Sequence, residues 1–432
     1  MQTNNIHSST NEWVKNWPVV MASAAGVALS TVHIYSLGVM IAPLEAEFGW
    51  SRAQISSGML IGSLVALLLS PFIGLLVDKL GPRRIALCGA TAYCIFLAMI
   101  SFANVSIWSW IALWTALAIG VKGLIPLIWT AAVSSVFVRG RGFALAVTLC
   151  GTGIGATLTP MLSSYLVEAY GWRMAYVGLA AFWALLVLPL LFFFFTSAKD
   201  RLRTEPPSDV QTAEVLLSGL TGREGFRSAR FYKLAIAAFG IALVAVSFTV
   251  NLVPILVSTG LARINAAEIA GLVGLASITG RLGGGYLLDR MNGNVVTAIA
   301  VLLPIVSCVL LLQMPGDPNA AKLAAIFLGL SLGAELDAVA YLATRHLGML
   351  SFGLLFGVIS GLLSLATGLG PMVVNYSYDI TGAYTLALWT YIPICAVSSV
   401  LFLSLGQYPN FPVRTDLITS KNSDAQASKA KR

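Results

Sequence analysis

The sequence is poor in charge: Asp, Glu, Lys and Arg together make up 10% of its 432 residues, against roughly a quarter in soluble domains. Hydrophobic residues make up 57%. Such a chain has too few polar groups to cover a water-soluble surface, which favours a protein embedded in a lipid bilayer. The formal net charge of +8 is better explained by membrane orientation than by nucleic acid, and we expect no nucleic-acid partner.

Signatures of catalysis and of bound cofactors are also missing. No segment has the spacing of a phosphate loop, a metal cluster or a nucleophile triad. The cysteines lie inside apolar stretches without metal-like spacing, and we interpret them as small core residues: Cys88, Cys94, Cys150, Cys308 and Cys395. We therefore expect a protein that is not an enzyme and that carries no metal and no cofactor.

Long apolar segments recur along the whole chain. A helix needs about 20 mostly apolar residues to cross the hydrocarbon core of a bilayer. The fold class predicted from these segments is an all-α membrane protein with twelve spans. The segments are 17–41, 55–77, 84–103, 108–137, 143–166, 173–196, 232–257, 266–288, 295–313, 322–344, 351–374 and 385–406.

Positive residues collect on one side of this predicted arrangement. Most of them fall in the two tails and the even-numbered loops. The positive-inside rule then places both termini in the cytoplasm. We expect a multi-pass protein of the plasma (inner) membrane that is a monomer. The predicted regions are an N-terminal tail (1–16), a first six-helix bundle (17–196), a charged cytoplasmic linker (197–230), a second bundle (231–406) and a C-terminal tail (407–432).

The two halves of the chain repeat each other at a constant offset of 211 residues. This offset relates six pairs that are spread over successive spans: Gly74 and Gly285, Pro43 and Pro254, Asp78 and Asp289, Pro160 and Pro371, Tyr165 and Tyr376, and Gly171 and Gly382. Equivalent helices six spans apart enter the membrane in the same direction, so two pseudo-symmetric bundles with a site between them are expected. This architecture favours a carrier over a pore.

The loop after the second predicted span carries a recognisable motif. The run from Gly74 to Arg84 reads GLLVDKLGPRR and resembles the Gly-x-x-x-Asp-(Arg/Lys)-x-Gly-x-(Arg/Lys)-(Arg/Lys) signature of the major facilitator superfamily. The resemblance implies that superfamily's two-bundle fold. Acid and cation near a helix end can form a latch that sliding helices make and break. The predicted latch residues are Asp78, Arg83, Arg84, Asp289 and Arg290.

Further motifs resemble the bacterial monocarboxylate and oxalate/formate porters, among them the stretch 333–348, Gly368-Leu369-Gly370-Pro371 and Tyr170-Gly171-Trp172-Arg173. The resemblance implies a secondary active transporter of a small organic anion, a monocarboxylate above all, by proton symport or anion exchange with alternating access. One alternative is a proton-driven efflux carrier for lipophilic or cationic compounds. A second is a transporter-like membrane receptor.

Charged residues inside predicted spans are functional candidates, because each costs about 2.5–3.5 kcal/mol at the bilayer centre. Arg281 lies eight residues before Asp289, which puts it ~12 Å inward from the helix end. Its planar guanidinium matches a carboxylate, and the porters bind the substrate carboxylate through a span-eight arginine that aligns with it. The alternative is a structural pair with Glu335 or Asp337. Lys122, between Gly120 and Gly123, is a second candidate anion anchor, with snorkelling or internal pairing as the alternative.

Proton coupling has three candidates. Glu335 and Asp337 are two residues apart on one helix, so their side chains point ~200° apart and cannot both face one cavity. We favour Asp337 as the coupling site, with structural pairing as the alternative. His33 belongs to a polar cluster on the first span and titrates in the useful range, although a lone histidine is often only hydrogen-bonded.

Three further residues are predicted to contact substrate. Tyr35 stands where the porters have a span-one lysine, a departure that weakens the transfer of their coupling mechanism to this chain. Tyr341 and Asn251 are polar residues in otherwise apolar spans and are candidate cavity residues. The partners expected for the whole protein are thus a small organic anion, a proton and the lipid bilayer.

Overall fold

The computed structural model describes residues 2–137, 141–196, 219–348, 350–409 and 411 and is built almost entirely of α-helices. The first half of the chain forms α1 (Gln2–Phe48), α2 (Arg52–Leu80), α3 (Pro82–Met99), the 3-10 turn η1 (Ile100–Phe102), α4 (Ile107–Lys122), α5 (Pro126–Val136), α6 (Arg141–Leu149) and α7 (Gly151–Phe194). The second half forms α9 (Gly222–Arg227), α10 (Ala229–Ser258), α11 (Arg263–Arg290), α12 (Gly293–Gln313), α13 (Pro318–Leu347), α14 (Phe352–Thr381) and α15 (Thr385–Leu403).

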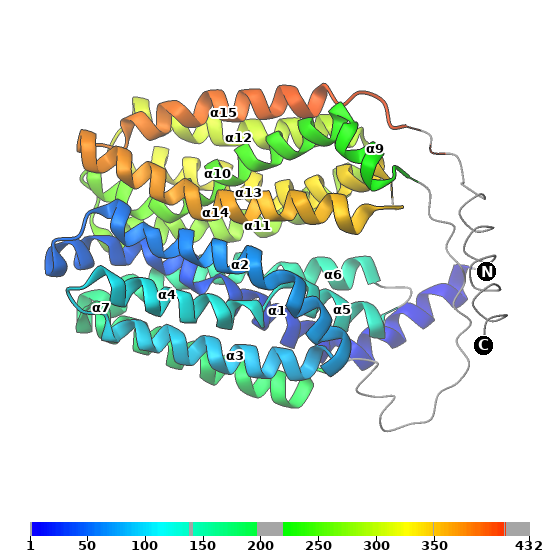
Figure 1. Ribbon diagram of the computed structural model, residues 1–432, viewed down its shortest axis with the longest axis horizontal. Coiled ribbons are helices and arrows are strands. Elements are labelled where there is room, and N and C mark those ends of the chain that lie inside the picture. The colour runs from blue at the N-terminus through cyan, green and yellow to red at the C-terminus, as the bar shows by residue number, and fades with distance from the viewer. Residues whose placement is uncertain (1, 138–140, 197–218, 349, 410, 412–432) are drawn as a thin grey trace, which may run out of the picture.

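The helices of each half gather into one bundle, and the two bundles lie side by side with their long helices running in roughly the same direction (Figure 1). The start of α1 and the end of α15 lie at one end of the molecule, which we call the proximal end; the opposite end, where α1 leads into α2 and α14 into α15, is the distal end (Figure 1). The predicted all-α membrane fold of two helical bundles is confirmed.

Within the described residues, nine helices are long and apolar enough to cross a membrane. One of them, α7, contains the larger part of predicted span 143–166 and nearly all of span 173–196, on either side of Gly171, where φ is +79° and ψ is 166°. Glycine adopts this backbone conformation without the steric cost that a Cβ would impose. The chain can therefore turn at Gly171 between two antiparallel segments.

Two predicted spans are interrupted in their interiors. Span 108–137 divides into α4 and α5 at Gly123, with Pro126 in the first turn of α5. Span 143–166 divides at Cys150 into α6 and the first part of α7. By contrast, α1 begins at Gln2 and so continues into the segment predicted as an N-terminal tail. An apolar run reveals the length of a span but not a break in its backbone.

Small residues let neighbouring helices approach closely. Gly89 on α3 faces Gly123 at the end of α4, and a Cβ on Gly89 would lie 2.4 Å from the Cα of Gly123. The two bundles meet in the same way, because a Cβ on Gly274 of α11 would lie 2.3 Å from the carbonyl oxygen of Gly153 on α7. In lipid, such close backbone packing is a main source of helix association.

Of the predicted linker, residues 197–218 lie outside the described part, as does most of the predicted C-terminal tail from residue 412. The rest of the linker contains α9, which begins with a capping box formed by Thr221 and Glu224. The segment before α9 is held by a bond from the Leu220 backbone N–H to the Leu347 carbonyl at 2.9 Å. The described part of the linker is thereby fixed to the proximal end of α13.

Candidate functional site

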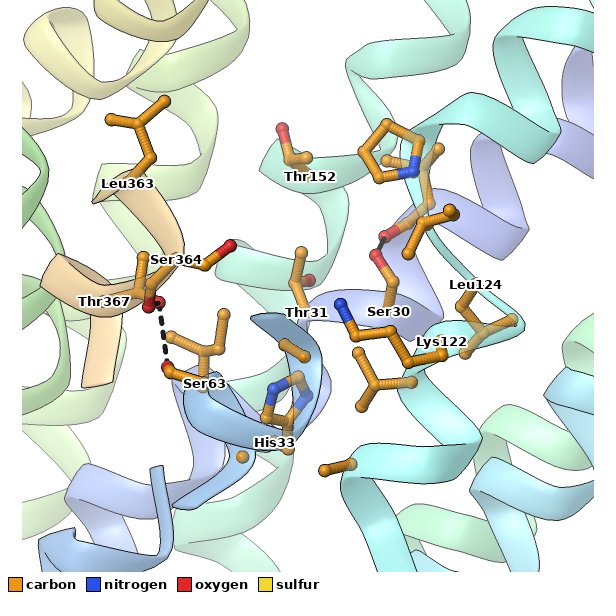
Figure 2. A pocket seen from close by; sticks show the side chains of 18 of the residues that line it. Ser30, Thr31, His33, Ser63, Lys122, Leu124, Thr152, Leu363, Ser364 and Thr367 are labelled. Atoms are coloured by element: carbon orange, nitrogen blue, oxygen red, sulfur yellow. Dashed lines mark hydrogen bonds between the residues drawn. The ribbon is translucent and has the colours of Figure 1, made fainter. Parts of the chain in front are cut away.

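A cavity of about 500 Å³ lies between the two bundles. Its walls come from α1, α2, α4, α5 and the α6–α7 junction on one side and from α11, α13 and α14 on the other. Most lining side chains are apolar, and the charged ones are Lys122, Arg281 and Asp337. Figure 2 shows Lys122, His33, Ser30, Thr31 and Thr152 arranged around this space. A cavity with two cations and one acid in an apolar wall suits a small anion with an apolar body.

Arg281 lines this cavity although only 8% of its surface is exposed. Its Nη1 donates to the carbonyl oxygen of Leu149 at 2.8 Å, and its Nε pairs with Oδ2 of Asp337 at 3.3 Å. The Leu149 contact crosses from the second bundle to the first. Nη2 has no hydrogen-bond partner among the described residues, so part of the guanidinium remains available to a ligand.

The Leu149 carbonyl is available because α6 ends there. In an unbroken helix the N–H of Gly153 would bond to it, but that N–H bonds to the Cys150 carbonyl at 3.0 Å. The hydroxyl of Thr152 donates to the Leu149 carbonyl at 2.9 Å, beside the Arg281 bond. The helix break thus provides the acceptor that positions the arginine.

The two acids of α13 occupy different environments. Asp337 lines the cavity with 38% of its side chain exposed, whereas Glu335 is 2% exposed and is not part of the cavity wall. This agrees with the helical geometry, which turns the two side chains ~200° apart. Asp337 is the partner of Arg281, one of the pairings that the sequence left open.

Lys122 is the last residue of α4, next to the backbone break at Gly123, and is 7% exposed. Its amino group points into the cavity toward Ser30 and Thr31 of α1 (Figure 2). Because α4 belongs to the first bundle and α11 to the second, Lys122 and Arg281 approach the cavity from opposite bundles. A bound anion could therefore contact both halves of the protein.

His33 also lines the cavity, and its ring Nδ1 lies 3.2 Å from the hydroxyl of Tyr93 on α3. Its ring meets that of Trp114 edge to face, with centroids 6.1 Å apart. Tyr35, two residues on, does not line the cavity but lies within electrostatic range of Arg281 and Glu335. Of these two residues of α1, His33 lines the candidate site and Tyr35 lies outside its lining.

Tyr341 and Asn251 lie away from the cavity. Tyr341 is near the proximal end of α13, where the guanidinium of Arg345 sits 5.9 Å from its ring. Asn251 is fully buried in α10 and donates to the Ser247 carbonyl at 2.8 Å. Neither placement brings these residues near Arg281, so a direct contact with substrate in this cavity does not follow from the structure.

The predicted latch residues lie at the proximal end. The side chain of Asp78 is outside the described part of the chain. Arg83 donates to the Phe192 carbonyl at 2.7 Å, and Arg290 stacks over Tyr286 at 4.2 Å. Asp289 and Arg84 are exposed, and none of the ion pairs between described residues involves a predicted latch residue.

A junction at the distal end, which the sequence did not reveal, joins the two bundles. Asp379 of α14 accepts the backbone N–H of Arg52 at 3.0 Å and of Ala53 at 2.9 Å, at the start of α2. The guanidinium of Arg52 donates to the hydroxyl of Tyr384 at 2.9 Å and lies 3.8 Å from the ring centre of Tyr378. These contacts, between residues more than 300 positions apart, join the two bundles at the distal end.

The sequence matches one protein family and is similar to individual transporters. The family model of the Major Facilitator Superfamily matches residues 23–371. The chain is 25% identical over 407 residues to the gallate transporter of Pseudomonas putida, covering 83% of this chain and 89% of that protein. It is 26% identical to the multidrug resistance protein MdtG of Dickeya zeae, covering 84% and 87%.

Among solved structures, the fold is similar to that of a bacterial homologue of the human lysosomal transporter Spinster, in an inward-facing and unoccupied conformation. The TM-score is 0.66 at 17% identity, and the match covers 91% of this chain and 98% of that one. At this identity the likeness concerns the fold, which both chains share over nearly their full lengths.

Proposed function

Since the chain belongs to the Major Facilitator Superfamily, whose matched relatives are transporters, we propose that it carries a small organic anion with a carboxylate group across the membrane. The gallate transporter supports this class, because gallate is an aromatic carboxylate. The carrier works by alternating access, with proton symport or anion exchange as its driving reaction.

The observation that carries this proposal is the position of Arg281. A buried guanidinium faces the cavity between the bundles, with one nitrogen unpartnered among the described residues. A carboxylate can take two parallel N–H bonds from such a fork, which gives geometric selectivity as well as attraction. Lys122 supplies a second positive charge from the opposite bundle, and the apolar wall accommodates the body of the substrate.

Alternating access is supported by the distribution of contacts between bundles. The distal junction around Arg52 and Asp379 is formed, while Arg83 and Arg290 of the predicted proximal latch each contact a residue of their own bundle. In our proposal this is the state in which the cavity communicates with the proximal side. With both termini in the cytoplasm, as the charge distribution predicts, this side is the cell interior.

The experiment uses purified protein in proteoliposomes. Uptake of labelled gallate and benzoate is measured with and without an imposed pH gradient, and the lipophilic cation tetraphenylphosphonium is tested in parallel. The proposal predicts saturable uptake of the carboxylates. Arg281→Gln should reduce that uptake at least tenfold, since one charged hydrogen bond contributes about 1.5–3 kcal/mol, and Arg263→Gln, at the distal end of the same helix, should not.

A proton-driven efflux carrier for lipophilic or cationic compounds is the second candidate. It is favoured by the partly exposed carboxylate of Asp337 in a mostly apolar wall and by the likeness to a multidrug resistance protein. In this case Arg281 only neutralises Asp337. Transport of tetraphenylphosphonium that depends on Asp337, without transport of either carboxylate, would establish the efflux function and overturn the anion proposal.

A further inference from the structure

A second acidic site lies behind the cavity wall. Glu335 on α13 is 2% exposed and takes no part in lining the cavity. Its carboxylate lies close enough to the hydroxyl of Ser331 to interact with it, but neither Oε2 nor that hydroxyl has a well-formed hydrogen bond among the described residues. The two residues are four positions apart on one helix, so they lie on the same face, one turn apart. Two buried oxygens are therefore adjacent and unsatisfied.

Among the described residues, no positive charge pairs with this carboxylate. No described Lys, Arg or His forms an ion pair with Glu335, and Arg281 of the adjacent α11 is engaged by Asp337. The titratable groups within electrostatic range are Tyr35 of α1 and Cys395 of α15, both neutral at physiological pH. The membrane-spanning parts of α10, α12 and α14, which also pack around α13, carry no charged residue next to it.

An ionised carboxylate enclosed in this way would be neither solvated nor paired, so the neutral, protonated acid is the stable form. A protonated carboxyl has one O–H donor, and the neighbouring Ser331 oxygen is an acceptor within reach of a small rotation. The pair can therefore hold one proton. Polar groups of this kind inside a membrane domain are costly and are retained where they serve transport.

We propose that Glu335 and Ser331 form a proton-binding site, separate from the substrate cavity, that couples transport to the proton gradient. The inference rests on the proposed carrier function and refines it. A proton binds to the Glu335 carboxylate when water reaches α13 from one side of the membrane. The same proton leaves to water on the other side after the bundles have moved, and the carboxylate is ionised only while it is hydrated.

Tyr35 shows that the two sites lie close to each other. It lies within electrostatic range of both Arg281 and Glu335, so a carboxylate that neutralises Arg281 changes the field at Glu335 through the intervening low-dielectric interior. Asp337 then has a different task, because it is the counter-ion of Arg281 in the empty cavity. The two acids of α13 thus have separate roles: Asp337 is the counter-ion of Arg281, and Glu335 binds the proton.

The test separates coupling from substrate transport. Proteoliposomes are assayed for gallate counterflow, which needs no net proton movement, and for gallate accumulation driven by a pH gradient. Glu335→Gln is permanently neutral and similar in shape. We expect it to retain counterflow and to lose accumulation, so that the internal-to-external ratio falls to about 1. Glu335→Asp should restore part of the accumulation, and Glu268→Gln, at the distal end of α11, serves as a matched control.

Normal accumulation by Glu335→Gln would overturn the proton site, as would accumulation by the wild type that follows a sodium gradient instead of a pH gradient. If the Gln variant does not fold, the Asp variant decides: a titratable acid on a shorter side chain should shift the pH dependence of accumulation, and an unshifted profile would refute the assignment. Absence of counterflow in the wild type would instead refute the proposed carboxylate transport.

Discussion

The guanidinium of Arg281 on α11 donates to the carbonyl oxygen of Leu149 at the end of α6, across the interface between the two bundles. A side chain that faces the candidate substrate cavity thus also joins the two halves, which move apart in the proposed transport cycle. A carboxylate that binds Arg281 competes with this carbonyl. In our account, substrate binding weakens one of the contacts that hold the bundles in their present arrangement.

Asp337→Asn should strengthen carboxylate binding. The substitution removes the carboxylate that competes for Arg281, so we expect the KM for gallate to fall about fivefold, equivalent to about 1 kcal/mol. The empty protein should melt at a lower temperature, because a buried cation has lost its partner. Thermal melting with and without gallate measures both effects. An Asp289→Asn control, exposed on α11, should melt like the wild type.

Lys122→Gln should weaken carboxylate transport without abolishing it. The amino group approaches the same cavity from the first bundle, so its loss removes one of two positive charges and should raise the KM for gallate roughly fivefold. Lys322→Gln, a change of the same type at the start of α13, should leave the KM within twofold. Equal kinetics for the two variants would remove Lys122 from the binding site.

Asp379→Ala should open the distal end. It deletes an acceptor that one bundle offers to the first turn of a helix in the other, a contribution of about 0.5–2 kcal/mol for a capping residue. In a background without native cysteines, Ser63→Cys near the Thr367 contact should react several-fold faster with an impermeant maleimide added from the distal side. Asp317→Ala, which removes a cap within one bundle, should leave the rate unchanged.

Gly89→Ala should destabilise the first bundle. A methyl group there would lie 2.4 Å from the Cα of Gly123, and overpacking against backbone typically costs about 1–3 kcal/mol. Gly357→Ala on α14 has nothing within 4 Å of the new methyl group and should be neutral or slightly stabilising. The melting temperatures of the two purified variants test this contrast, and equal values would argue against close packing of α3 on α4.

The sequence revealed the fold more readily than the site. Span lengths follow from the requirement that apolar runs cross the bilayer, and the repeat at offset 211 predicted two bundles. The breaks at Gly123 and Cys150 escaped detection, because glycine and small residues are common in unbroken membrane helices too. The break at Cys150 matters most, since it frees the carbonyl to which Arg281 binds.

The structure brings together three of the charged residues that the sequence predicts for the site. Arg281, Lys122 and Asp337 stand out because a charge inside a membrane needs a partner or a cavity, and all three line the same space. Tyr341 and Asn251 do not, because a neutral polar residue can face any neighbour and only tertiary packing decides which. The junction of Arg52 with Asp379 escaped detection for a different reason: both residues lie just outside predicted spans, far apart in the chain, where charges are common.

The most direct test of the central claim, that the Arg281 guanidinium binds the substrate carboxylate, is gallate uptake by proteoliposomes that contain Arg281→Lys, with Arg263→Lys as the matched change on the same helix. Lysine keeps the charge but lacks the planar fork. We predict at least a tenfold loss of uptake for Arg281→Lys and uptake within twofold of the wild type for Arg263→Lys. Wild-type uptake by Arg281→Lys would contradict the account.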